Sequence, residues 1–123
     1  MSAADGPHHA RHDLDETIHQ PVRFSIAATL YHAERVDFGF LRRHLDVTES
    51  NLSRHLAALE EAGYVLADKV FEGKRARTWL SLTATGRSAF EGHIDALNRI
   101  VAWPEQDRGE NRARVLGSAP RAR

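Results

Sequence analysis

The stretch 48–63 constrains the fold more than any other part of this chain, because it carries the marks of a capped amphipathic helix. The Thr48 hydroxyl can accept from the amides of the first turn, and Gly63 can take the positive φ that ends a helix. Between them, Leu52, Leu56 and Leu59 recur at spacings of four and three residues, which places them on one face. The sequence therefore predicts a helix that buries one stripe in a core.

The opposite face of this helix carries short hydrogen-bonding side chains and one arginine, namely Ser50, Asn51, Ser53 and Arg54. Such side chains can read base edges in a DNA major groove, and recognition helices present their N-terminal residues in this way. A solvated polar face explains the same pattern about as well, because surface helices are commonly polar outward. The flanking segments have to decide between these interpretations.

The residues ahead of this helix predict two more helices. The first covers 21–33 and starts with proline, which suits a first helical turn because its missing N–H is not needed there. The second covers 38–44 and is capped by Asp37. The helix 38–44 and the helix that starts after Thr48 are joined by a short turn, and the later one is polar outward, which is the pattern of a helix-turn-helix. Arg42 and Arg43 on the helix 38–44 would then lie near the DNA backbone.

After Gly63 the pattern changes to a period of two, which predicts strands over 64–71 and 77–82 with a turn over 72–75. The hairpin carries three cations, Lys74, Arg75 and Arg77. Clustered like charges repel one another unless a polyanion is the partner. Trp79 fits a packing anchor better than a ligand platform, because large aromatic side chains dominate small cores.

A last helix is predicted from Ala84 to about residue 103, capped by Thr83. Its apolar residues alternate spacings of four and three, as in a short coiled-coil seam: Phe90, Ile94, Leu97 and Val101. The seam covers fewer than two heptads, so it can hold two chains together only with help or pack on its own domain. We expect a homodimer, because paired half-sites give helix-turn-helix proteins their affinity and specificity.

Length and composition bound the remaining possibilities. With 123 residues we expect one domain over 14–103, between a disordered arm over 1–13 and a disordered basic tail over 104–123. Net charge is zero, but the cations are gathered in a few clusters and the acids lie elsewhere. Cysteine is absent, and no apolar run is long enough for a signal peptide or a membrane span. A cytoplasmic protein is expected.

Three segments together resemble a known family. The residues over 51–65, the front segment 21–26 and the segment 82–90 after the hairpin look like the MarR and ArsR type bacterial transcriptional regulators. The resemblance covers roughly 20–101 and is nearest to their small winged helix-turn-helix domain. It implies an α+β, mainly α fold, with a three-helix core, a two-stranded wing and a C-terminal helix.

The family resemblance also implies roles for individual residues. Ser50, Asn51, Ser53 and Arg54 would read the major groove, while Lys74, Arg75 and Arg77 would grip the phosphate backbone or the minor groove. The chain departs from the family in lacking cysteine ligands and the long extra helices that hold an effector, so no effector is readable.

Two groups of histidines and acids fit metal binding only poorly. His8, His9 and His12 lie in the predicted arm without a scaffold around them, and the acids beside His93 have no second histidine. No metal or other cofactor is therefore expected.

The leading hypothesis is a dimeric regulator that acts as a repressor and binds double-stranded DNA through the helix 48–62 and the wing 64–82. The alternative is a winged-helix module that binds another protein, because one fold hosts many functions. An enzyme is not expected, since the histidines are scattered and no serine or carboxylate stands at triad-like spacing.

Overall fold

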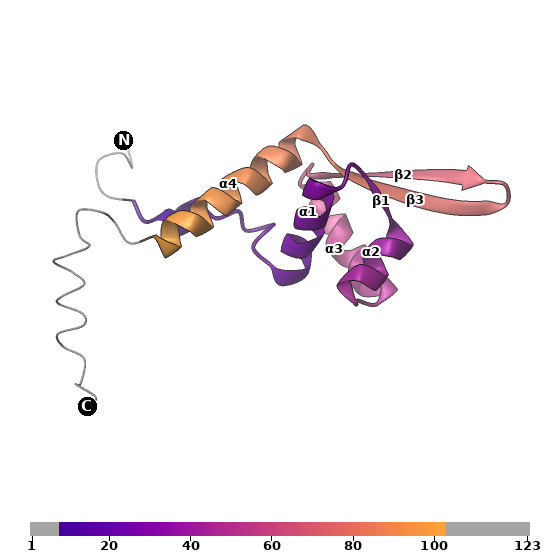
Figure 1. Ribbon diagram of the computed structural model, residues 1–123, viewed down its shortest axis with the longest axis horizontal. Helices are drawn as coiled ribbons and strands as arrows, with labels where there is room; N and C mark the ends of the chain where they lie inside the picture. Colours follow the sequence, from indigo (N-terminus) through magenta and orange to yellow (C-terminus); the bar gives the residue numbers. More distant parts are fainter. Residues whose placement is uncertain (1–7, 103–123) are drawn as a thin grey trace, which may run out of the picture.

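The computed structural model describes residues 8–102. Its elements are the 3-10 helix η2 (Ala10–Asp13), α1 (Pro21–His32), β1 (Val36–Asp37), α2 (Phe38–Leu45), α3 (Glu49–Glu61), β2 (Val65–Glu72), β3 (Arg75–Leu82) and α4 (Ala84–Val101). The first three α-helices gather beside the base of the sheet (Figure 1). The β2–β3 hairpin projects from them on one side, and α4 extends on the other.

Each predicted N-cap is confirmed, because its side chain accepts a hydrogen bond from a first-turn amide. Asp37 accepts from the Phe40 amide at 2.6 Å, and Thr48 accepts from the Asn51 amide at 3.1 Å. Thr83 accepts from the Gly86 amide at 2.9 Å. Caps of this kind stabilise a helix by about 1 kcal/mol each, and here they fix where α2, α3 and α4 begin.

The sheet has three antiparallel strands in the order β1-β3-β2, one more than the predicted two-stranded wing. The extra strand, β1, pairs Val36 with Leu80 and Asp37 with Trp79. The sequence predicts a short extended link over 34–36, and the pairing of Val36 with Leu80 shows that this link joins the sheet as a third strand. The turn of the hairpin is also tighter than predicted, since only Gly73 and Lys74 separate β2 from β3, with Gly73 at φ 67°.

One apolar core joins all of these elements except α4 and η2. It consists of Ile26, Leu30, Val36, Leu41, Leu52, Leu56, Leu59, Val65 and Leu80. Each fully buried leucine or isoleucine contributes roughly 1.5–3 kcal/mol through the removal of its side chain from water. The predicted stripe of α3 therefore faces this core, and its opposite face is left to solvent.

A second apolar cluster docks α4 on α1. Phe90 is only 6% exposed and packs with Ile18 and Ala27, while the rings of Phe24 and Tyr31 lie 5.7 and 5.0 Å from its ring. The first member of the predicted dimer seam is thus a core residue of its own domain. The sequence pattern did not show this, because packing on α1 and packing on a second chain favour the same spacing.

The segment before α1 is ordered over the described part. Ala10 is buried, and the Arg99 guanidinium donates to the Asp13 carboxylate at 2.8 Å, so η2 lies against α4. The predicted disordered arm over 1–13 therefore does not hold for residues 10–13. Residues 1–7 and 103–123, which include the predicted tail, lie outside the described residues.

Candidate nucleic-acid interface

The N-terminal half of α3 presents polar side chains outward. Ser50, Ser53 and Arg54 are exposed, and Asn51 is half-buried. The Arg54 guanidinium donates to the Asn51 side-chain oxygen one turn earlier. This hydrogen bond holds the arginine along the helix surface and leaves its other N–H groups for an acceptor outside the chain. The structure thus brings together the four side chains that the sequence predicts to read bases.

The inner face of α3 fixes the orientation of that polar face. Leu52, Leu56 and Leu59 are buried, and His55 beside them is only 4% exposed. Nδ1 of His55 lies 3.1 Å from an Nη1 atom of Arg23, so it accepts a hydrogen bond and carries no proton. Burial and then the charges of Arg54 and Arg23 lower the pKa of His55. His55 therefore belongs to the packed inner face of α3.

The outer surface of α2 adds an aromatic and basic strip. The Phe40 ring, 44% exposed, stacks on the His44 ring at a centroid distance of 5.4 Å. Arg43 is exposed and Arg42 is half-buried. Both arginines are predicted to contact the DNA backbone, and Arg43 is the more exposed of the two.

The wing carries its cations at different depths. Lys74 and Arg75 stand at the turn and are exposed. Arg77 lies further back, opposite Val70, and its Nε atom is 3.8 Å from the Asp37 carboxylate and 3.7 Å from the Glu72 carboxylate. Two acids thus partly neutralise Arg77, which makes it a weaker phosphate contact than its sequence position indicates.

A polar hollow of about 370 Å³ lies between α2 and the wing. Its lining includes the guanidinium-bearing residues Arg43, Arg75 and Arg77 together with Asp37 and the start of α2. The antiparallel pairing of β1 with β3 brings them together, because Asp37 lies opposite Trp79 and α2 follows Asp37 directly. Sequence reasoning placed these arginines on separate elements and did not bring them to one site.

Two further residues of this surface escaped the sequence reasoning. Arg35 lies over the ring of Trp79 at 4.1 Å from its centroid, so Trp79 packs at the outer base of the sheet under an arginine. Phe71 is 69% exposed on β2, opposite Ala76 and two residues from Lys69. Its position next to the turn is the signal that was available, since a large apolar side chain at a basic tip has no core to enter.

Other kinds of site have little support in the described residues. Within residues 8–102, no three histidine or acidic side chains are arranged to hold a metal ion. His93, a candidate beside Glu91 and Asp95, instead points inward and accepts from the Asp15 amide at 3.0 Å. No helix over 8–102 has the length and apolarity to cross a membrane.

Comparison with protein families identifies the family to which this chain belongs. The family described as winged helix DNA-binding domain matches residues 22–101, which are most of the chain. The chain belongs to this family. An uncharacterized protein of Methanocaldococcus jannaschii is 40% identical to it over 73 residues, which are 59% of this chain and 79% of that protein.

Solved structures agree with this winged helix assignment. A transcriptional regulator homologue from Pyrococcus horikoshii OT3 is 28% identical, has a TM-score of 0.67 and is matched over 71% of this chain and 86% of that one. The reduced regulator AbfR bound to DNA has a TM-score of 0.64 over 88% of this chain and 75% of that chain. At 19% identity, this similarity shows a shared fold and no more. This winged helix protein is thus a DNA-binding transcriptional regulator.

Proposed function

We propose that this winged helix regulator binds as a homodimer to paired half-sites in double-stranded DNA and acts as a repressor in the cytoplasm. α3 enters the major groove, where Ser50, Asn51, Ser53 and Arg54 contact base edges. These four side chains share the outward face of a helix whose other face is buried, and this arrangement supports the proposal most directly. A helix held in this way cannot turn its polar face elsewhere.

The backbone contacts come from the hollow between α2 and the wing. Arg43 and Arg75 line it together, so one phosphate can approach two guanidinium groups at once. Lys74 at the turn extends the same positive surface, and Arg42 and Arg77 contribute less because burial or nearby acids restrain them. Phosphate contacts of this kind position the protein, while α3 supplies the sequence preference.

The dimer contact uses the far end of α4. Ile94 and Leu97 are half-buried, Ile100 is 36% exposed and Val101 is 82% exposed. Phe90, the first residue of the predicted seam, already fills the domain core, so a partner chain would pack on the later residues. A second copy here would place two α3 helices for two half-sites.

The test is a fluorescence titration of the full chain on DNA fragments from its own upstream region, at low and high salt. We expect one fragment to bind in the nanomolar range and Arg54→Ala to lose that preference. Arg87→Ala is the matched control, because it removes another exposed arginine, from α4. Equal weak binding to every fragment by the unaltered protein would contradict sequence-specific regulation and favour a protein-binding module.

A further inference from the structure

Arg23, in the first turn of α1, has a half-buried guanidinium whose partners are neutral. Its Nε atom donates to the carbonyl of Thr17, and one Nη1 hydrogen is directed to Nδ1 of His55 at 3.1 Å. A guanidinium has five N–H groups, so three stay available. Among residues 8–102 no carboxylate forms an ion pair with Arg23. Its charge is therefore left without a counter-ion in the described chain.

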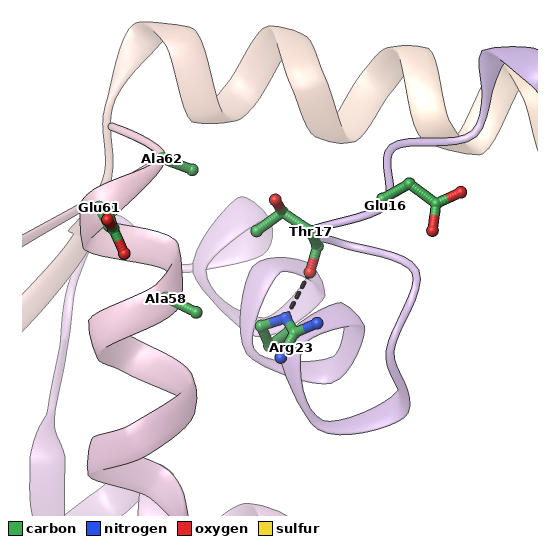
Figure 2. Close-up of a pocket in the computed structure, with 6 residues that line it drawn as sticks. All are labelled: Glu16, Thr17, Arg23, Ala58, Glu61 and Ala62. Atoms are coloured by element: carbon green, nitrogen blue, oxygen red, sulfur yellow. Dashed lines mark hydrogen bonds between the residues drawn. The ribbon is translucent and has the colours of Figure 1, made fainter.

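This guanidinium lies in a hollow of about 380 Å³ between α3 and the segment before α1. The methyl groups of Ala58 on α3 and of Ala62, the residue that follows α3, point toward Arg23 and Thr17 (Figure 2). Glu61 and Glu16 lie on opposite sides of the arginine, and both are exposed. The lining thus combines one cation, a small apolar patch and two separated anions.

This charge pattern selects against simple ions. A lone anion on Arg23 would be repelled by Glu16 and Glu61, and a lone cation beside either glutamate would be repelled by Arg23. A molecule with both charges can pair its anionic group with Arg23 and its cationic group with one of the glutamates. The volume is near the lower end of the range for ligand pockets, which limits the occupant to a small molecule.

We propose that this hollow binds a free α-amino acid in its zwitterionic form. The ligand carboxylate accepts from the remaining N–H groups of Arg23, in the two-pronged geometry that guanidinium groups favour. The ammonium group lies toward one of the two glutamates, and the side chain covers the methyl groups of Ala58 and Ala62. This site is separate from the DNA-reading residues, which occupy the other end of α3.

The proposed site connects directly to the recognition helix. Arg23 reaches His55 on α3, and Ala58 and Glu61 belong to the same helix. A ligand on Arg23 therefore acts on a contact between α1 and α3 and can change the angle between these helices. If DNA binding prefers one such angle, the amino acid and the DNA change one another's affinity by the same factor.

The test is thermal unfolding of the full chain with each of the twenty L-amino acids, followed by calorimetric titration of those that raise the Tm. A ligand that binds only the folded state raises the Tm progressively with its concentration. Each binding amino acid is then compared with its amine and its acid alone, which for leucine are 3-methylbutylamine and 4-methylpentanoate. We expect the amino acid to bind and both single-charge analogues to fail.

Two variants assign the binding to this hollow. Arg23→Gln and the double variant Glu16→Gln with Glu61→Gln should each weaken binding at least about tenfold, because each removes a charge-assisted hydrogen bond. The glutamates are exposed, so the double variant folds even if Arg23→Gln does not. Failure of all twenty amino acids to raise the Tm, or unchanged affinity in the double variant, would overturn the proposal. Neither result depends on whether the protein binds DNA.

Discussion

The Nε2 atom of His93 lies 3.3 Å from the Nδ1 atom of His19, although the two residues are 74 positions apart in the chain. Nδ1 of His93 accepts from the Asp15 amide at 3.0 Å, so its proton sits on Nε2 and is donated to His19. His93 is 1% exposed. Burial and then the neighbouring His19 lower the pKa of His93, while the Asp15 charge acts in the opposite direction.

The first prediction is a loss of stability in acid. His93 and His55 both have lowered folded-state pKa values against an ordinary value of 6.5. The unfolded chain therefore takes up their protons first as the pH falls. Stability is complete above 6.5 and declines below it, with a slope of at most about 1.4 kcal/mol per pH unit for each proton. Urea unfolding between about pH 7.5 and about pH 5 measures this decline.

The variant His93→Asn separates His93 from the other titrating groups. An asparagine oxygen can still accept from the Asp15 amide but cannot take up a proton near neutral pH. We expect a shallower acid decline in this variant. His32→Gln is the control, because His32 is exposed at the end of α1. An identical pH profile for His93→Asn and the unaltered protein would contradict the assignment.

A second prediction concerns the hydroxyl of Tyr64, which donates to the Asp15 carboxylate at 2.6 Å. This hydrogen bond, with burial, raises the pKa of Tyr64 to about 12. Tyr64→Phe should lower the free energy of unfolding by about 1–2 kcal/mol, since it leaves a half-buried carboxylate short of a donor. Tyr31→Phe loses a similar bond to the exposed Glu91 and should cost less. Equal losses in urea unfolding would refute the difference.

Two glycines of α4 should respond in opposite directions to alanine. A Cβ atom on Gly86 would overlap the carbonyl group of Tyr64, whereas nothing lies within 4 Å of one on Gly92. Gly86→Ala should therefore destabilise the protein by about 1–3 kcal/mol. Gly92→Ala should stabilise it by about 0.5–1 kcal/mol, because alanine favours a helix over glycine. The Tm of each variant measures these effects. A Gly86→Ala variant as stable as the unaltered protein would contradict the close packing of Gly86 on Tyr64.

The wing should contribute to DNA binding in two distinguishable ways. Arg75→Ala removes a proposed phosphate contact, so it should weaken binding to all sequences and reduce the salt slope by about one. Phe71→Ala removes an apolar side chain beside the same turn, so it should weaken binding with the slope unchanged. Titrations at several salt concentrations measure both. A changed slope for Phe71→Ala would show that it acts through the neighbouring cations instead.

Dimerisation through α4 predicts a position-dependent effect of charge. Val101→Asp places a carboxylate on the apolar side of α4, at a position that is 82% exposed. It should convert dimers to monomers, as measured by analytical ultracentrifugation. Asn98→Asp adds the same charge on an exposed polar position of α4 and should leave the dimer intact. Monomers in the unaltered protein, or equal dissociation by both variants, would rule out this contact.

The sequence by itself determined the local elements. Helix caps at Asp37, Thr48 and Thr83, together with the stripe on α3, depend on neighbours within a few residues, so their spacing was enough to place them. The polar face of α3 followed from the same spacing. The hairpin was also readable, because its alternation and Gly73 are local signals.

Tertiary structure decided which of these elements meet. Only the pairing of Val36 with Leu80 creates the third strand and brings Arg43 beside the wing. Only the docking of α4 on α1 turns Phe90 from a predicted dimer contact into a core residue. Arg23 contacts His55, which is 32 residues away, and His93 contacts Asp15, which is 78 residues away. Contacts over such separations leave no period in the sequence.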